Sequence, residues 1–350
     1  MENPLASDLD HVLAQTHGLW EELRGARVFL TGGTGFFGCW LLETFLWAND
    51  RLRLGASIVV LTRDASGFAG KAPHLAGHPS VTLHDGDVRT FAFPRGAFSH
   101  VIHGATTSSA VVEPADMFDT IVEGTRRALD FARHAGATRF LLTSSGAVYG
   151  RQPPELTHVP EDYRGGPDSA DANQVYAEGK RAAEMLCAVY ADVRLKPTIA
   201  RCFAFVGPYL PLDAHFAIGN FIRDALQGGP IRVAGDGTPY RSYLYAADLA
   251  IWLWTILLRA QSMRPYNVGS EAAVSIDDLA HLVARTVAPG VTVSVALAPV
   301  AGAPANRYVP SAARADSELA LRVTLPLVDA VRRTAEWHRT IGRTSQIGHR

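Results

Sequence analysis

The sequence predicts an α/β fold in which a doubly wound parallel sheet is followed, on the C-terminal side, by a smaller α+β lobe. Over residues 1–206, short apolar or β-branched runs alternate with longer helical patterns. This alternation is typical of a parallel sheet covered by helices on both faces. From about Gly207 onward the elements become shorter, and proline and glycine become more frequent. The chain has 350 residues, 47% of them hydrophobic, and exceeds the roughly 250–300 residues at which a single core stops growing.

Each element follows from its own pattern. Leu5, Leu9 and Val12 recur at helical spacing and predict a lead-in helix within residues 1–25. Short apolar and β-branched runs predict strands at Arg27–Thr31, Ser57–Thr62, Val81–His84, His100–Gly104, Arg139–Ser144 and Pro197–Phe203. Longer periodic or apolar segments predict helices at Phe36–Ala48, Met117–His134, Val175–Tyr190 and Ala246–Arg259. We expect residues 1–206 with 242–266 to form the sheet domain, and 207–241 with 267–350 to form the second lobe.

Charge and cysteine content narrow the functional classes. The 33 Lys+Arg residues nearly balance the 34 Asp+Glu residues, and the formal net charge is −1, so we expect no nucleic-acid partner. No apolar run approaches the ~20 residues of a membrane span. The acidic N-terminal segment lacks an apolar signal core, which favours a cytoplasmic protein without a membrane partner. Cys39, Cys187 and Cys202 are widely spaced, and we expect buried thiols in a reducing compartment rather than disulfides or a metal site.

A glycine-rich turn follows the first predicted strand. Glycines at positions 32, 35 and 38 have the spacing G-x-x-G-x-x-G between that strand and a helix. Gly32 permits the tight turn, Gly35 lets a pyrophosphate approach the backbone, and Gly38 lets the helix pack closely on the strand. This context predicts a dinucleotide site, to which Phe36 and Phe37 also belong.

The end of the second predicted strand indicates which dinucleotide is bound. A carboxylate there usually binds the adenine ribose of NAD, but this sequence has Thr62 followed by Arg63. A guanidinium pairs well with the 2′-phosphate of NADP, so NADP is the preferred cofactor. NAD remains open because Asp64 can reach the ribose if the register is off by two residues. Further cofactor contacts are expected near the ends of the third and fourth strands, at Asp87, Val88 and Ala105. Asp87 is either an acceptor for the adenine amino group or a solvated turn carboxylate.

A tyrosine and a lysine four residues apart lie on a predicted helix. Tyr176 and Lys180 share one helix face, and a lysine ammonium beside a phenol lowers the pKa of that phenol. Such a tyrosine can exchange a proton with a carbinol while a hydride moves to or from nicotinamide, and we expect Lys180 to orient the cofactor ribose as well. At the end of the fifth strand, Ser145 is expected to hydrogen-bond the reacting oxygen, with Ser144 beside it in contact with substrate.

The glycine-rich turn from Thr31 to Gly38, the run Ser144–Gly150 and the pair Tyr176–Lys180 together resemble the extended short-chain dehydrogenase/reductase superfamily. Within it, the chain is similar to the nucleotide-sugar epimerase/dehydratase branch over roughly residues 25–340. The resemblance implies a Rossmann lobe that holds NAD(P) and a C-terminal lobe that holds a nucleotide sugar. Its helices 117–134 and 175–190 resemble those that pair in dimeric relatives, which implies a homodimer.

The resemblance also implies substrate contacts in the second lobe. Arg241, within Gly235–Asp248, and Arg307 match positions where arginines contact the substrate diphosphate, and two converging arginines would act as charge-assisted clamps. The segment Asn267–Gly269 matches a further family stretch. Thr107 and Asn220, which follow a strand end or open the second lobe, are further pocket candidates.

The departures from the branch select among its reactions. Dehydratases and decarboxylases resemble one another in placing acidic residues just after the catalytic serine or threonine, where this chain has Gly146 and Ala147. Neither can act as acid or base, which argues against a dehydratase. Ala204 replaces an asparagine that usually touches the substrate diphosphate. We therefore expect NADPH-dependent reduction of a 4-keto nucleotide sugar. A 4-epimerase with tightly bound NAD and a non-catalytic NAD(P)-binding module are the alternatives.

Overall fold

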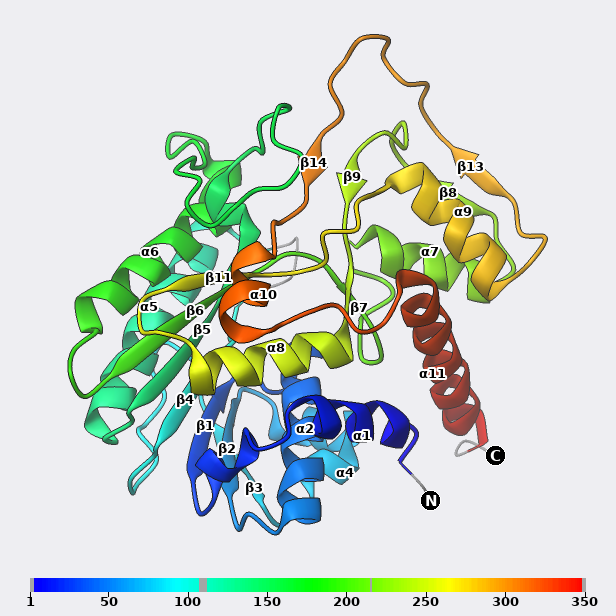
Figure 1. Ribbon diagram of the computed structural model, residues 1–350. Helices are drawn as coiled ribbons and strands as arrows, with labels where there is room; N and C mark the ends of the chain where they lie inside the picture. Colours follow the sequence, from blue (N-terminus) through cyan, green and yellow to red (C-terminus); the bar gives the residue numbers. More distant parts are fainter. Residues whose placement is uncertain (1–2, 107–111, 215, 348–350) are drawn as a thin grey trace.

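The computed structural model describes residues 3–106, 112–214 and 216–347. At its centre lies a seven-stranded parallel sheet in the order β11-β6-β5-β4-β1-β2-β3 (Figure 1). The strands are β1 (Arg27–Thr31), β2 (Ser57–Thr62), β3 (Val81–Asp85), β4 (His100–His103), β5 (Arg139–Ser145), β6 (Lys196–Cys202) and β11 (Pro265–Val268). The predicted doubly wound Rossmann sheet is confirmed, and each of the six expected strands begins and ends within one residue of its expected bounds.

The seventh strand, β11, was not predicted from the sequence. It has four residues and lies at the sheet edge, where it pairs in parallel with β6. Its first residue is Pro265, which has no N–H for a ladder and is tolerated at sheet edges. So short a run, without alternation of polar and apolar residues, carries no strand signal of its own.

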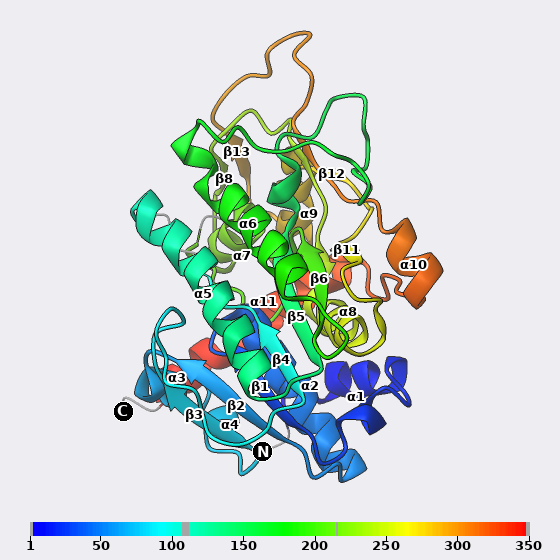
Figure 2. The same cartoon turned by 90° about the vertical axis from the view of Figure 1, so that its left-hand side faces the viewer.

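Helices cover both faces of the sheet. α5 (Pro114–His134) and α6 (Val175–Tyr190) lie side by side on one face (Figure 2), and α2 (Phe36–Leu52) and α8 (Ala246–Arg259) cover the other. Strand side chains alternate between the two cores: in β1, Phe29 packs under α5 and α6, whereas Val28 and Leu30 pack under α2 and α8. The apolar helix α8 has the predicted bounds and is buried nearly all round.

The lead-in segment differs from the single helix expected. α1 (Ala6–Gln15) packs on α2 and α8 and is followed by a separate 3-10 helix, η1 (Trp20–Leu23). Between them, the Thr16 hydroxyl donates to the carbonyl of Val12 at 2.6 Å, and Gly18 has a φ of +77°. A residue in this left-handed region ends a helix, which explains the break.

The second lobe lies beyond the carboxyl ends of the strands (Figure 1). It contains a three-stranded ribbon in the order β12-β9-β14 and a two-stranded pair of β8 and β13. The elements found there are α7 (Ala217–Leu226), β8 (Ile231–Val233), β9 (Tyr240–Arg241), β12 (Val274–Ser275), α9 (Ile276–Val287), β13 (Val293–Val295), β14 (Arg307–Tyr308) and α11 (Leu327–Ile347). The short helix α10 (Ala313–Leu319) packs instead on β11 and α8. A small parallel pair of β7 (Phe205–Val206) and β10 (Leu244–Tyr245) lies between the lobes.

Two further findings bear on function. None of the described helices is both long and apolar enough to cross a bilayer, and the described ranges contain no cluster of three or more side chains suited to hold a metal ion. All three cysteines are buried free thiols, as expected from their spacing.

Candidate active site

The glycine-rich turn lies at the carboxyl end of β1. Gly32 has a φ of +74°, and a Cβ there would lie 2.5 Å from the carbonyl carbon of Gly104. At Gly38 a Cβ would lie 2.3 Å from the Cα of Gly33, so both positions require glycine. α2 starts directly after Gly35, which puts its first backbone N–H groups beside the turn, where a pyrophosphate binds in such folds. The residues therefore fit a dinucleotide.

Phe36 and Phe37 are the first two residues of α2. Both are half-buried and pack on the main core. The Phe37 ring meets the ring of Phe205 edge-on, with centroids 4.9 Å apart. The Phe37 ring thus packs the amino end of α2 against β7.

A pocket of about 250 Å³ adjoins the turn and is lined by Thr34, Thr62, Arg63, Asp64, Gly67, Phe68 and Lys71. In the pocket wall, Asp64 caps the short helix α3 (Ala65–Lys71): its carboxylate accepts the backbone N–H of Gly67 at 2.8 Å and the Ser66 hydroxyl at 3.0 Å. These hydrogen bonds hold the pKa of Asp64 below its usual value. The carboxylate is therefore engaged by its own helix.

Two cations line the same pocket. Arg63 is exposed at the end of β2. The last residue of α3, Lys71, donates from Nζ to the carbonyl oxygen of Thr34 in the glycine-rich turn at 2.9 Å. Lys71 was not predicted from the sequence, because no local pattern marks it and only the packing of α3 brings it to the turn.

Asp87 is paired with an arginine. Its Oδ1 accepts the side-chain Nε–H and the backbone N–H of Arg89, each at 2.9 Å, and Arg89 also donates to Asp116 of α5 at 2.6 Å. The hydrogen bond from Arg89 lowers the pKa of Asp87. Val88, the next residue, is buried. Its side chain packs against Gly124 of α5, where a Cβ would lie 2.9 Å from Val88 Cγ1.

At the end of β4, Ala105 donates its N–H to Thr31 Oγ1 at 3.1 Å. The same hydroxyl contacts Nδ1 of His103 at 2.8 Å, and Nε2 of His103 contacts the hydroxyl of Thr125 at 3.1 Å. Burial lowers the pKa of His103 to about 3. His103 is therefore a neutral interior histidine that supports the strand ends.

The structure brings Ser145, Tyr176 and Lys180 together, as the sequence predicted. Lys180 is buried, donates to the carbonyl oxygen of Thr143 at 2.9 Å, and lies with Nζ 5.8 Å from the centroid of the Tyr176 ring. Ser145 ends β5 and hydrogen-bonds to Tyr176. Its Oγ also accepts the backbone N–H of Ala147 at 3.1 Å. These contacts form a hydroxyl-lined centre at the carboxyl end of the sheet.

Burial controls the protonation of this centre. It raises the pKa of Tyr176, although the hydrogen bond with Ser145 acts in the other direction. This net direction is opposite to the lowering that the sequence analysis expected from Lys180. Burial also lowers the pKa of Lys180, to about 8. At neutral pH, Tyr176 is therefore a protonated phenol beside a charged lysine.

Ser144 has a different environment from Ser145. Its hydroxyl donates to Oε1 of Glu184 on α6 at 2.6 Å. Arg201 of β6 donates to both oxygens of Glu184, at 3.0 and 2.7 Å. The structure therefore ties Ser144 to an inner ion pair rather than to Tyr176.

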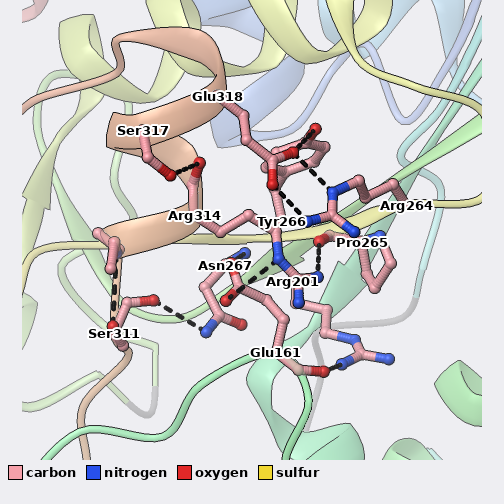
Figure 3. Close-up of polar contacts among 12 residues, drawn as sticks. Glu161, Arg201, Arg264, Pro265, Tyr266, Asn267, Ser311, Arg314, Ser317 and Glu318 are labelled. Atoms are coloured by element: carbon pink, nitrogen blue, oxygen red, sulfur yellow. Dashed lines mark hydrogen bonds and ion pairs between the residues drawn. The ribbon is translucent and has the colours of Figure 1, made fainter.

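Asn267 of β11 connects this ion pair to the second lobe. The Tyr149 hydroxyl, which accepts from Arg201 at 2.9 Å, donates to Oδ1 of Asn267 at 2.7 Å. The backbone N–H of Asn267 donates to Glu161 at 3.0 Å, and its amide nitrogen donates to the carbonyl of Ser311 at 3.0 Å (Figure 3). Asn267 thus anchors the segment that follows β14.

The two arginines predicted to contact substrate lie on opposite faces of the β12-β9-β14 ribbon. β14 pairs with β9 in parallel, with Arg307 opposite Tyr240 and Tyr308 opposite Arg241. Paired residues share a face and successive residues alternate. Accordingly, the Arg307 guanidinium lies 4.3 Å from the Tyr240 ring centroid, and that of Arg241 lies 6.0 Å from the Tyr308 ring centroid. The arginines therefore do not converge in this structure.

Asn220 and Thr107 were also predicted to line the substrate pocket. Asn220 lies on α7, and its Oδ1 accepts from Arg223 at 3.3 Å. Thr107 lies outside the described residues.

Tyr308 reaches the centre although no sequence signal marked it. Its hydroxyl lies 3.4 Å from Ser145 Oγ, and its ring packs against Phe203 with centroids 4.7 Å apart. Only the pairing of β14 with β9 places it there. A tyrosine from the second lobe thus joins the residues supplied by the sheet domain.

Phe203 also fills the space beside Gly146. A Cβ at Gly146 would lie 2.7 Å from carbons of the Phe203 ring. No side chain fits at that position while Phe203 keeps its place. An acidic group at position 146, next to Ser145, therefore requires the Phe203 ring to shift.

Comparison with known proteins gives a family and a set of relatives. The pattern of the NAD dependent epimerase/dehydratase family matches residues 28–269. UDP-glucuronic acid decarboxylase 2 of Arabidopsis thaliana is 30% identical over 274 residues, covering 77% of this chain and 59% of that protein. UDP-glucuronic acid decarboxylase 1 of Xenopus tropicalis is 29% identical over 316 residues, covering 89% of this chain and 72% of that protein. The chain thus spans about three fifths of the length of the Arabidopsis relative.

Solved structures show the same fold. An epimerase from Methanothermobacter thermautotrophicus superposes with a TM-score of 0.76 at 19% identity and covers 98% of both chains. A UDP-glucose 4-epimerase from Thermotoga maritima, with UDP-glucose, gives a TM-score of 0.74 at 20% identity, covering 90% of this chain and 99% of that one. A dTDP-glucose 4,6-dehydratase from Streptomyces venezuelae, with NAD bound, gives 0.75 at 23% identity, covering 90% of this chain and 97% of that one.

Proposed function

The chain belongs to the NAD dependent epimerase/dehydratase family, and we propose that it is a reductase that uses NADPH to reduce a 4-keto nucleotide sugar. The nucleotide sugar is proposed because the relatives are named for UDP- and dTDP-sugars. The observation that carries the reaction type is the makeup of the centre around Ser145. The centre is lined by hydroxyl groups, the Phe203 ring takes the space of a side chain at position 146, and position 147 holds Ala147, so neither position supplies an acid.

Each residue of the centre has a part in this reaction. When bound, the nicotinamide supplies the hydride that adds to the carbonyl carbon. Ser145 donates a hydrogen bond to the carbonyl oxygen, and Tyr176 gives that oxygen its proton and recovers one from solvent. Lys180 holds positive charge beside the phenol and orients the cofactor ribose. The raised pKa of Tyr176 supports reduction, since the protonated phenol is the form that this direction uses.

The cofactor pocket supports NADP. Arg63 and Lys71 line it together with the glycine-rich turn, and cations pair well with a 2′-phosphate. Asp64 is engaged in capping α3. A 4-epimerase with bound NAD is the second candidate, because the Asp64 carboxylate lines the same pocket and can accept ribose hydroxyls if its cap opens.

We also propose a cytoplasmic homodimer that pairs through α5 and α6. These helices pack together and expose Phe118, Met185 and Val189, of which the last two are 65% and 66% exposed. Burying such side chains against a second copy removes apolar surface from water. The buried free thiols suit a reducing compartment.

The test combines cofactor identification with turnover. Purified protein is denatured and any released nucleotide identified by mass, and NADPH consumption is followed with dTDP- and UDP-4-keto-6-deoxyglucose. We expect an empty site that prefers NADPH over NADH, and turnover that Tyr176→Phe abolishes. Tightly held NAD with no net consumption of NADPH supports the epimerase instead. If neither cofactor binds, the protein is not an oxidoreductase of this family type.

A further inference from the structure

The second lobe contributes one side chain to the reaction centre. Tyr308 is carried by β14 and shares a ribbon face with Arg241. Its hydroxyl lies 3.4 Å from Ser145 Oγ, and the Arg241 guanidinium lies 6.0 Å from the centroid of its ring. Tyr308 therefore stands between the predicted phosphate-contacting arginine and the serine that faces the reacting oxygen. A substrate that spans these two residues must pass the Tyr308 side chain.

The backbone around Tyr308 is held from both sides. Tyr240 of β9 donates its N–H to the carbonyl of Asn306 at 2.7 Å. Val309, which is fully buried, donates its N–H to the side chain of Gln152 at 3.0 Å and accepts the N–H of Val159 at 2.9 Å. Together with the Phe203 ring below it, these contacts fix where the phenol points.

The Tyr308 hydroxyl can exchange its hydrogen bond with Ser145 for one with a substrate oxygen. Among the described residues, Ser145 is its one hydrogen-bonding partner, and 3.4 Å is long for a bond between two hydroxyls. Ser145 Oγ is meanwhile engaged by Ala147 and Tyr176. A substrate oxygen at normal distance would make a better partner for Tyr308 than Ser145 does. Burial raises the pKa of Tyr308, so the group is a neutral hydrogen-bond donor.

We propose that Tyr308 is a substrate-contacting, specificity-determining residue that donates a hydrogen bond to a hydroxyl on the sugar ring next to the reacting carbon. This inference rests on the proposed function for the identity of the substrate. The proton for the reacting oxygen still comes from Tyr176, and Tyr308 selects sugars that carry an oxygen at the neighbouring position. A site that hydrogen-bonds a substrate hydroxyl discriminates strongly against the analogue that lacks it.

Binding to the protein saturated with NADP⁺ tests this inference. Calorimetry compares UDP-glucose with UDP, and dTDP-glucose with dTDP, on the wild type and Tyr308→Phe, which keeps the ring against Phe203. We expect Tyr308→Phe to weaken the binding of the nucleotide sugar about tenfold, the loss of one hydrogen bond, and to leave that of the nucleoside diphosphate unchanged. The control is Tyr240→Phe, on the opposite face of the same ribbon, which should change neither.

The outcomes separate this inference from the proposed function. If Tyr308→Phe, folded as judged by its thermal transition, binds both nucleotide sugars like the wild type, the inference is wrong. The inference is also wrong if Tyr308→Phe loses as much affinity for the nucleoside diphosphate as for the nucleotide sugar. It is wrong as well if the wild type binds no nucleotide sugar. If the wild type reduces no keto sugar but Tyr308→Phe loses affinity as expected, the reductase proposal fails while the contact of Tyr308 with the sugar stands.

Discussion

Replacing Glu184 by glutamine tests how much the ion pair between Glu184 and Arg201 stabilises the fold. The side chains of Arg201 and Glu184 are 15% and 13% exposed, and two hydrogen bonds of 3.0 and 2.7 Å join them. Glu184→Gln keeps the shape but leaves the Arg201 charge without its counter-ion. Removing one partner of a buried pair costs about 3–5 kcal/mol, a large part of the roughly 5–15 kcal/mol that stabilises a typical protein.

The assay is denaturant unfolding of four proteins: the wild type, Glu184→Gln, Arg201→Met and the double variant. We expect the double variant to be more stable than Glu184→Gln, because it has no unpaired charge. Glu178→Gln is the control on the same helix, since its partner Arg181 is half-exposed and 3.7 Å away, and such pairs contribute about 0–1 kcal/mol. If Glu184→Gln unfolds like this control, the buried ion pair stabilises the fold no more than the exposed one does.

Four further outcomes are expected. NADPH affinity should fall as the pH rises through about 8, because the pKa of Lys180 is lowered to about 8 and its charge is lost above it; calorimetry on either side of that pH measures this, and Lys180→Met should remove the dependence. Arg63→Ala should weaken NADPH binding about tenfold and leave NADH binding unchanged, whereas equal losses would contradict a 2′-phosphate contact. Gly146→Ala should cost about 1–3 kcal/mol in denaturant unfolding, since its Cβ meets the Phe203 ring at 2.7 Å; an unchanged midpoint would mean that the ring can move. Met185→Asp should turn a dimer into a monomer in light scattering, and a wild-type monomer would refute the pairing.

The features predicted from the sequence are those that a local pattern of residues determines. The strands β1, β2, β4 and β5 are buried on both faces, so their apolar runs stand out. The spacing of Tyr176 and Lys180 places both on one helix face. Lys71 and Tyr308 depend instead on packing between segments far apart in the chain, which no local pattern records. The edge strand β11 has too few residues for a periodic signal. The direction of the Tyr176 pKa shift was missed because the degree of burial is a property of the folded chain.

Phe203 makes the chemistry of this centre hard to change one substitution at a time. An acidic side chain at position 146 needs the space that the ring occupies, yet the same ring supports Tyr308 with centroids 4.7 Å apart. Adding the acid first creates a clash, and shrinking Phe203 first releases the tyrosine. Libraries that vary single positions would therefore score both steps as failures. Mutagenesis toward an acid at position 146 therefore has to vary positions 146, 203 and 308 together, whereas an acid at Ala147 is a separate change.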